Sequence, residues 1–465
     1  MRDGAAIAAG RLTAVTSRAL RFGGGTTLPG RVAGVVSPGI VRRLSARLAH
    51  GVVLISGTNG KTTTARLLGG AIDAAGLVAI HNRAGANLIS GIASALVEHA
   101  SLSGEPGGDL GLFEVDEATL PAAIEATRPR AVCLLNLFRD QLDRYGEIDI
   151  IADRWRGALT QLGDDALVIF NADDPLVADV GRTYRGRTMT FGLDTAPSAA
   201  ATAGVRTLED AADSRYCYRC GRPYEYTLVT VGHMGHYHCP QCGDTRPAAH
   251  VAARDVRLHA ADGATLTVIW DDTILPLSTN LPGLYNVYNV TAAAAGALGL
   301  GIAPETVGRG IMATAPAFGR GERVTIDGRE ALMLLAKNPA GFNEVLRTVL
   351  AAEETPVVLL AINDLIADGR DISWLWDVDF EMLRDRARAV VVTGIRADDM
   401  ALRLKYAGVN GGHIVVEHDG AQALTRARDA LRDGERLYVL TTYTAMLQLR
   451  EILTRKGYVR DFWKQ

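Results

Sequence analysis

Cysteine is scarce in this sequence: five residues among 465 are too few for a disulfide-stapled secreted domain. Four of the five fall in two Cys-x-x-Cys units, a spacing that suits a metal ion in a reducing compartment. Long apolar runs are also missing. No segment approaches the roughly 20 apolar residues of a membrane span, and the first 20 residues lack the apolar stretch of a secretory signal. We therefore expect a cytoplasmic protein that is not an integral membrane protein.

Runs of one charge are absent as well. The chain has 49 Lys and Arg against 52 Asp and Glu, a formal net charge of −3, and its basic residues are scattered. Binding to nucleic acid needs a basic stripe or patch, so we expect no nucleic-acid partner. A P-loop ATPase whose metal ribbon binds nucleic acid remains an alternative, and it would require salt-sensitive binding of DNA or RNA.

Short apolar runs alternate with amphipathic stretches from Val52 onward. "VVLI", "LGLFEV", "AVCLLN" and "ALVIF" predict buried strands with helices between them, such as residues 62–75. This alternation predicts an α/β fold, in which helices cover both faces of a parallel sheet. We expect a leader segment at 1–50, a central ATP-binding domain at 51–323 with an insertion at 214–247, and a second α/β domain at 324–465.

The stretch "VVLISGTNGKTTTARLL" predicts a strand, a glycine turn and the start of a helix. In such a phosphate-binding loop the backbone N–H groups and the helix N-terminus favour phosphate, the lysine reaches the terminal oxygens and the following hydroxyl suits Mg²⁺. Ile55 stands where the general pattern has its first glycine, so the loop is a shortened variant. The predicted ATP-binding residues here are Gly57, Thr58, Asn59, Gly60, Lys61, Thr62 and Thr63.

A nucleotide loop also needs an acidic residue for its metal ion. "LFEVDEATL" supplies Glu114 and Asp116 at the end of the next predicted core strand, where a carboxylate would face the phosphates. We expect Glu114 to bind Mg²⁺ with Thr62, and Asp116 is the second candidate. Asp116 or Glu117 could instead cap the helix that begins near Thr119.

Several motifs resemble the Mur ligases, ATP-dependent amide-forming enzymes related to folylpolyglutamate synthase. They are "GTNGKTT", "FEVDEAT", "LLNLFRDQLDRYGEID", "NADDP" and "LPGLYNVYNVTAAAA", in that order. The resemblance implies Lys61 and Thr62 on phosphate and Mg²⁺, Glu114 on the metal, and Arg320 near the phosphates. It further implies that Asn171, Asp174 and Asn286 surround the adenosine, and that the carboxy-terminal domain is Rossmann-like.

The sequence departs from the Mur pattern at three positions. Gln141 stands where typical members have histidine, and "RWRG", with Arg154 and Arg156, stands where they have a carbamylated lysine. A second metal ion held in the usual way is therefore not expected. Tyr285 replaces the histidine that usually precedes the asparagine of the adenosine site.

The four paired cysteines have the spacing of a zinc ribbon. Cys217 and Cys220 are followed, after 18 residues, by Cys239 and Cys242, and a glycine follows the second cysteine of each pair. Four thiolates fill a tetrahedral zinc shell and leave no position for water or substrate, so we expect a structural Zn²⁺. The four histidines near the cluster, His233, His236, His238 and His250, are expected to be exposed.

A Mur-type domain with a four-cysteine ribbon is similar to the MurT family, the ligase-like subunits of lipid II isoglutaminyl synthase. "LLAKNPAGFNEVL" and "AINDLIADGRDISWLWDVDFE" extend that resemblance over the carboxy-terminal domain. It implies amidation of the α-carboxylate of D-glutamate in the lipid II stem peptide, through an acyl phosphate, at the inner face of the cytoplasmic membrane. Lys337 and Asn338 are expected to face substrate, and an N-terminal helix cap by Asn338 is the equal alternative.

The reaction needs ammonia from glutamine, and glutamine hydrolysis normally needs a reactive cysteine. Four cysteines are assigned to zinc, and Cys133 lies in the apolar run "AVCLLN", where a buried thiol is inert. The resemblance implies a partner, a GatD-like class I glutamine amidotransferase, whose catalytic histidine is oriented by an aspartate of the ligase subunit. We expect that aspartate to be Asp377, with Asp371 second and Asp368 third.

An extended backbone over "WLWDVD" would place Trp374 and Trp376 on one face and Asp377 on the other, so that the tryptophans help to form a docking surface. A turn with solvated acids and core tryptophans is the alternative. A ligase that adds an amino acid, of the Mur or folylpolyglutamate-synthase type, is the alternative function. The zinc ribbon and the missing lysine argue against it.

Overall fold

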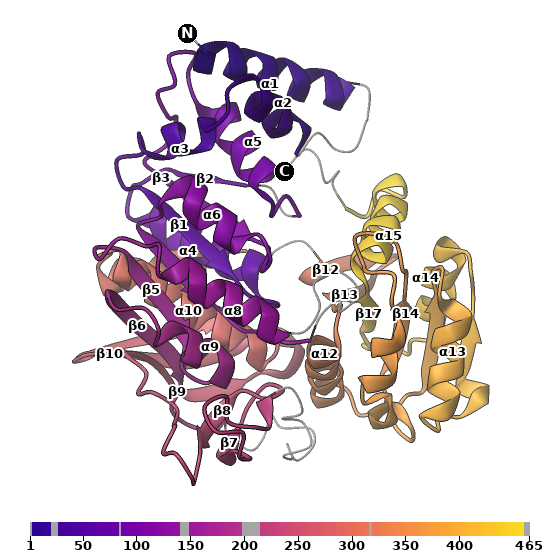
Figure 1. The fold of residues 1–465 in the computed structure, drawn as a ribbon. Coiled ribbons are helices and arrows are strands. Elements are labelled where there is room, and N and C mark those ends of the chain that lie inside the picture. Colours follow the sequence, from indigo (N-terminus) through magenta and orange to yellow (C-terminus); the bar gives the residue numbers. More distant parts are fainter. Residues whose placement is uncertain are drawn as a thin grey trace.

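The computed structural model describes residues 2–19, 27–82, 85–139, 148–197, 214–315 and 319–459. Within these ranges two α/β domains lie side by side, and a layer of helices covers the far end of the first (Figure 1). No helix in these ranges combines the length and the apolarity needed to cross a lipid bilayer.

The helical layer is formed by the start of the chain. It consists of α1 (Arg2–Ala19), α2 (Leu28–Val36) and α3 (Ile40–Ser45), packed on α5 (Ile89–His99). Arg11 donates to the carbonyl oxygens of Val97 and Ala100 at the end of α5. Gly30 allows the close approach of α2, because a Cβ there would lie 2.0 Å from the carbonyl oxygen of Ser90. The segment is therefore part of the first domain's core.

The first domain is built on a nine-stranded sheet in the order β11-β10-β9-β6-β5-β4-β1-β3-β2. The part of the sheet in the order β9-β6-β5-β4-β1-β3-β2 is parallel. β10 and β11 extend it beyond β9 as antiparallel strands. Their bounds are β1 (Val52–Ser56), β2 (Ala79–His81), β3 (Leu110–Val115), β4 (Ala131–Leu134), β5 (Leu167–Asn171), β6 (Arg187–Leu193), β9 (Val251–Leu258), β10 (Ala264–Trp270) and β11 (Thr273–Thr279). β1, β3, β4 and β5 are buried throughout, which explains their continuous apolar sequence.

Helices cover both faces of this sheet, as the sequence predicts. One face carries α4 (Lys61–Ala74), α10 (Leu284–Gly299) and α11 (Pro304–Ala313), and the other carries α6 (Leu120–Thr127), α8 (Ile148–Leu159) and α9 (Pro175–Gly181). A small antiparallel hairpin of β7 (Glu225–Val229) and β8 (Gly235–His238) lies beside α9. This hairpin belongs to the cysteine-bearing insertion.

The second domain is a six-stranded sheet in the order β12-β13-β17-β14-β15-β16, parallel except for β12. Its strands are β12 (Arg320–Ile326), β13 (Arg329–Leu335), β14 (Val357–Ala361), β15 (Ala389–Thr393), β16 (Ile414–Val416) and β17 (Leu437–Thr441). α12 (Pro339–Ala352) and α13 (Ala397–Tyr406) cover one face, and α14 (Gly420–Asp429) and α15 (Tyr443–Arg455) cover the other. The predicted fold class, with two α/β units, is confirmed.

Candidate functional site

The glycine loop joins the carboxyl end of β1 to the start of α4. Gly60 has φ 90°, and a Cβ on it would lie 2.1 Å from Oδ1 of Asn289, so the backbone conformation and the space both require glycine. The backbone N–H of Asn59 donates to Oδ1 of Asn136 at 2.8 Å, and the N–H of Thr58 donates to the carbonyl oxygen of the same residue at 2.9 Å. The loop is thus held from two neighbouring elements in one conformation.

Lys61 lies at the first position of α4 with its ammonium group turned back toward the loop. Nζ donates to the carbonyl oxygens of Gly57 at 2.5 Å and Thr58 at 3.3 Å, and pairs with Oε1 of Glu117 at 3.2 Å. The Lys61 and Glu117 side chains are only 10% and 11% exposed. Glu117 therefore helps to set the direction of the lysine side chain. A phosphate group at this loop would compete with Glu117 for the ammonium group.

Thr62 and Glu114 lie together, as the sequence predicts for a Mg²⁺ site. The Thr62 hydroxyl donates to Oε2 of Glu114 at 2.5 Å, and Glu114 is buried at the end of β3. Asn82 fixes the backbone there by accepting from the Glu114 N–H at 3.0 Å and donating to its carbonyl oxygen at 2.8 Å. Hydroxyl and carboxylate oxygens are the ligand types that Mg²⁺ prefers, so these residues fit that ion. The carboxylate of Asp116 accepts instead from the N–H of Ala118, in the turn before α6.

The second domain also reaches this loop. Arg320, the first residue of β12, lies close enough to Glu114, Tyr285 and Tyr443 to interact with each electrostatically. Burial lowers the pKa of its guanidinium, and Glu114 and the two tyrosines oppose that effect. A cation and a carboxylate from two domains therefore meet beside the phosphate loop.

Asn338 of the second domain contacts the loop directly. Its amide Nδ2 donates to Oδ1 of Asn59 at 3.0 Å, while its own Oδ1 accepts from the N–H of Gly341 at 2.9 Å as the cap of α12. Of the two interpretations offered by the sequence, the helix cap is confirmed, and the same side chain contacts the loop.

The residues predicted around adenosine are all engaged by other parts of the protein. Asn171, at the end of β5, donates to the carbonyl oxygen of Leu135 at 3.0 Å. Asp174 caps α9 and also accepts from the N–H of Leu137 at 2.9 Å. Asn286, on α10, donates to the carbonyl oxygen of Pro282 at 2.7 Å and accepts from Asn289. Their roles toward adenosine stay predictions.

Four residues that the sequence analysis did not assign support this site: Asn82, Glu117, Asn136 and Asn289. Asn289 follows Asn286 by three residues, a spacing that places both on one face of a helix, and this signal was available in "LYNVYN". Asn136 follows the run "AVCLL" directly, at the carboxyl end of a predicted strand. The partners of Asn82 and Glu117 are 32 and 56 residues away, so no local pattern points to them.

The four paired cysteines form one cluster whose sulfur atoms all lie within 4.8 Å of one another. Sγ of Cys217 is 3.5 Å from that of Cys242, and Sγ of Cys220 is 3.4 Å from that of Cys239. Four sulfurs at zinc–sulfur bonds of about 2.3 Å would be separated by roughly 3.8 Å, so the donor set and its size fit a tetrahedral zinc ion.

The two cysteine pairs form matching turns. The N–H of Gly221 donates to the carbonyl oxygen of Cys217, and that of Gly243 to the carbonyl oxygen of Cys239; both glycines have φ near 74°. A backbone hydrogen bond from Cys242 is the largest of the effects that lower the pKa of the Cys239 thiol to about 6, which favours the thiolate that a metal ion binds. The glycine placement expected from the sequence is therefore present in both turns.

The expectation of exposed histidines near this cluster is wrong for His233, which is buried, and for His236, which is partly buried. Nε2 of His236 lies 2.7 Å from the carbonyl oxygen of Leu193, and Nε2 of His233 lies 3.2 Å from Oδ2 of Asp174. Both histidines face the first domain, because the hairpin that carries them packs against it. Sequence spacing alone did not reveal that packing.

The acidic and tryptophan-rich stretch at 367–380 is not extended. Ser373–Asp377 form a 3₁₀-helix, so the predicted alternation of faces is wrong. Trp374 packs against the core residue Phe342 at 5.8 Å between ring centroids. Trp376 is 52% exposed, and its ring meets that of Tyr406, which is 69% exposed, at 5.6 Å. One tryptophan therefore belongs to the core and the other to the surface.

The three candidate aspartates differ in their surroundings. Asp377 is exposed at the end of the 3₁₀-helix. Asp371 is exposed, and its carboxylate accepts from the N–H of Ser373 at 2.8 Å. Asp368 is buried and accepts from the N–H of Thr444 at 2.8 Å and from its hydroxyl, and burial raises the pKa of its carboxyl. Asp377 and Asp371 are thus both reachable by another protein, whereas Asp368 is not.

Arg403 holds this stretch on the domain. Its guanidinium is buried and donates to the carbonyl oxygens of Leu375 at 3.1 Å and Val378 at 2.7 Å, and it pairs with Glu381 at 2.9 Å. It also lies 5.5 Å from the ring centroid of Trp376. The surface that carries Trp376 is therefore fixed from α13.

Of the five cysteines, all of which the structure describes, four form the cluster that fits a zinc ion, and the fifth is no available nucleophile. Cys133 is buried in β4, and burial raises the pKa of its thiol to about 12. Gln141, where Mur ligases have histidine, lies outside the described residues. Arg156 pairs with Asp153 and Asp179, each at 2.6 Å, and carries no group that could bind a second metal ion.

Comparisons with known proteins agree with this arrangement. Family models match at residues 55–240 (Mur ligase middle domain) and 335–446 (MurT ligase C-terminal). The chain is 35% identical over 434 residues to the Staphylococcus aureus (strain COL) protein named lipid II isoglutaminyl synthase (glutamine-hydrolyzing) subunit MurT, covering 92% of this chain and 93% of that one. It is 31% identical to the protein of that name from Streptococcus pneumoniae (strain ATCC BAA-255 / R6), with 95% of each chain covered.

Solved structures share the fold. The structure of a pseudomurein peptide ligase type C from Methanothermus fervidus superposes with a TM-score of 0.66 and 20% identity, covering 89% of this chain and 80% of that one. At that identity the likeness establishes the fold alone.

We predict that Lys61→Ala raises the Kd for ATP by about tenfold to a hundredfold, because hydrogen bonds to charged groups contribute about 1.5–3 kcal/mol each. Isothermal titration calorimetry measures this. Lys405→Ala, which removes an exposed lysine of α13, is the control and should bind as the unaltered chain does. An unchanged Kd in folded Lys61→Ala would contradict the assignment.

We predict one zinc ion per purified chain and its loss in Cys217→Ser, measured by inductively coupled plasma mass spectrometry. Cys133→Ala, which alters the cysteine outside the cluster, should keep its zinc. Full zinc content in Cys217→Ser would show that the cluster is not the binding site.

Proposed function

The chain belongs to the MurT family of Mur-type ATP-dependent ligases, and we propose on that basis that it amidates the α-carboxylate of D-glutamate in the lipid II stem peptide. The product would be D-isoglutamine. The nitrogen would come from a separate glutaminase subunit. One combination of features supports this proposal: Lys61, Thr62 and Glu114 are assembled at the phosphate loop, the one cysteine outside the cluster is buried, and the other four would be occupied by zinc.

The proposed chemistry has two steps. A carboxylate is a poor electrophile until its oxygen becomes part of a good leaving group. An oxygen of the carboxylate attacks the γ-phosphorus of ATP, the bond to the bridging oxygen breaks, and ADP leaves. Ammonia then adds to the carbonyl carbon of the acyl phosphate, inorganic phosphate leaves with the former carboxylate oxygen, and the nitrogen loses a proton to give the amide.

The proposed residue roles follow the arrangement of charge. Lys61 and Arg320 would stabilise the negative charge on the transferring phosphoryl group, the first from the loop and the second from the other domain. Thr62 and Glu114 would hold Mg²⁺, which when bound neutralises phosphate charge. Asn171, Asp174 and Asn286 would lie around the adenosine, with Gly57, Thr58, Asn59, Gly60 and Thr63 around the phosphates. The zinc ion would be structural.

Ammonia supply requires a partner. Near neutral pH free ammonia is mostly protonated and cannot attack, so it must be released close to the acyl phosphate. We propose a GatD-like class I glutamine amidotransferase that docks on the surface around Trp376 and Tyr406 and contributes the cysteine and histidine. Asp377 would orient that histidine as the third member of a triad. The complex would work in the cytoplasm, at the inner face of the membrane that carries lipid II.

We predict that the isolated chain amidates lipid II with ATP and a high concentration of ammonium chloride, but not with ATP and glutamine. Mass spectrometry of the muropeptide measures both arms. Adding the amidotransferase subunit should restore the glutamine arm. Glutamine-dependent amidation by the isolated chain would contradict the division of labour, and ATP turnover that requires a free amino acid instead of ammonium would favour the amino-acid ligase.

We predict that Asp377→Asn lowers the glutaminase rate of the complex about a hundredfold or more, because a triad histidine that loses its aspartate adopts the wrong orientation. Amidation from ammonium chloride should be unchanged, since the ligase site is untouched. Asp398→Asn on α13, an exposed carboxylate nearby in sequence, is the matched control. Full glutaminase activity in Asp377→Asn would contradict the assignment of Asp377 as the aspartate that orients the histidine. Asp371 would then be the next candidate, tested by the same substitution.

A further inference from the structure

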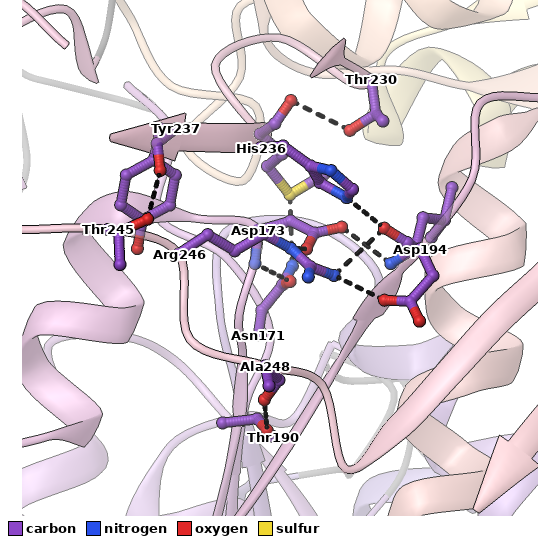
Figure 2. A network of polar contacts seen from close by, with 12 residues as sticks. Asn171, Asp173, Thr190, Asp194, Thr230, His236, Tyr237, Thr245, Arg246 and Ala248 are labelled. Carbon is purple, nitrogen blue, oxygen red and sulfur yellow. Dashed lines mark hydrogen bonds and ion pairs between the residues drawn. The ribbon is translucent and has the colours of Figure 1, made fainter. Parts of the chain in front are cut away.

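The turn between β7 and β8, taken together with the first residue of β8 as residues 230–235, lies against the segment Asn171–Asp174 at the end of β5 (Figure 2). Asn171 donates to the sulfur of Met234 at 3.2 Å, and the N–H of Gly235 donates to the carbonyl oxygen of Asp173 at 2.8 Å. Asn171, one of the predicted adenosine residues, is therefore in direct contact with the cysteine-bearing insertion.

Asp173 is fully buried and is neutralised from the insertion. Nε of Arg246, four residues after Cys242, donates to its Oδ1 at 2.6 Å, and the N–H of Leu193 donates to its Oδ2 at 2.8 Å. The hydroxyl of Tyr288 on α10 also donates to Oδ2 at 2.6 Å, and that hydroxyl is in turn 2.6 Å from the hydroxyl of Thr230 in the turn. A buried carboxylate without such partners would be strongly destabilising, so these contacts fix the segment.

His233 connects the turn to both ends of the nucleotide site. Its Nε2 lies 3.2 Å from Oδ2 of Asp174, and its ring lies 4.6 Å from that of Phe138 between centroids. Phe138 in turn donates its N–H to the hydroxyl of Thr58 in the phosphate loop at 3.0 Å. One side chain of the insertion thus touches the adenosine segment and a neighbour of the loop.

A residue beside the cysteine cluster also contacts α9, the helix that follows this segment. Asp244, two residues after Cys242, accepts from Arg182 at 2.7 Å, and Arg182 follows the last turn of α9. Asp174 caps the other end of α9, where His233 lies. The short helix is therefore held at both ends by the insertion.

We propose that the ribbon is a positioning element of the nucleotide site: cross-linking of its four cysteines fixes the turn 230–235, and the turn sets the geometry of Asn171, Asp173 and Asp174. This rests on the proposed ATP-dependent function. A hairpin of two short strands is marginal in water, so a cross-link between its ends is what keeps the turn in place. The residues of the turn act through the segment and do not touch the reacting atoms.

The test measures the Kd for ATP by titration calorimetry, together with zinc content and the melting midpoint without nucleotide. His233→Ala should raise the Kd about tenfold, as expected for the loss of one interaction with a charged group, while keeping its zinc. His233→Gln, whose amide can donate to Asp174, should recover most of the affinity. His238→Ala, which alters a partly exposed histidine that pairs with Glu225, should bind as the unaltered chain does.

Removal of zinc gives the second arm. Cys217→Ser should raise the Kd for ATP by at least the factor expected for His233→Ala. The double variant with His233→Ala should bind ATP only slightly more weakly than Cys217→Ser, since both substitutions act through the same turn. Equal affinity in His233→Ala and the unaltered chain would overturn the proposal. If His233→Ala does not fold, unchanged affinity in Cys217→Ser would overturn it instead. Failure of the unaltered, zinc-loaded chain to bind ATP would overturn the proposed function itself.

Discussion

The phosphate loop depends on contacts from outside its own strand and helix. Gly60 lies against Asn289 of α10, the backbone of Asn59 is held by Asn136 after β4, and the Asn59 side chain pairs with Asn338 of the second domain. At Gly60 there is no room for a larger residue, and the other two contacts are hydrogen bonds to asparagine side chains. The second domain also brings a cation to this place, because Arg320 interacts electrostatically with Glu114. Under the proposed function, nucleotide binding and the relative position of the domains would therefore be linked.

The chain divides its chemistry between two regions of opposite character. The ligase site is buried and built from side chains held by hydrogen bonds, whereas the stretch around Trp376 and Asp377 is exposed and fixed from beneath by Arg403. The difference in exposure between the two regions matches what each would have to do. A phosphoryl transfer site must exclude water, while a carboxylate that completes another subunit's site must be reachable. The cysteine cluster forms a third centre, and its contacts with α9 and the turn 230–235 join it to the first.

Local sequence predicted the parts of the structure that local physics determines. Continuous apolar runs became buried strands, the glycines after Cys220 and Cys242 adopted positive φ, and the glycine loop opened α4 at Lys61. It did not predict what depends on packing between distant elements. His233 is buried because the hairpin folds back on β5. The "WLWD" stretch is a 3₁₀-helix, and the distant Arg403 donates to the carbonyl oxygens of Leu375 within it and Val378 after it. Glu117 as the partner of Lys61 likewise arises only when β1 and β3 pair.

The most direct test of the account follows the oxygen atoms of the substrate. Lipid II with a heavy oxygen isotope at both oxygens of the D-glutamate α-carboxylate is turned over with ATP and an ammonia source, and the released phosphate is analysed by mass spectrometry. The account predicts one heavy oxygen in each phosphate released, because the carboxylate oxygen attacks the γ-phosphorus and leaves with it. Amide formation with no label in the phosphate would contradict it.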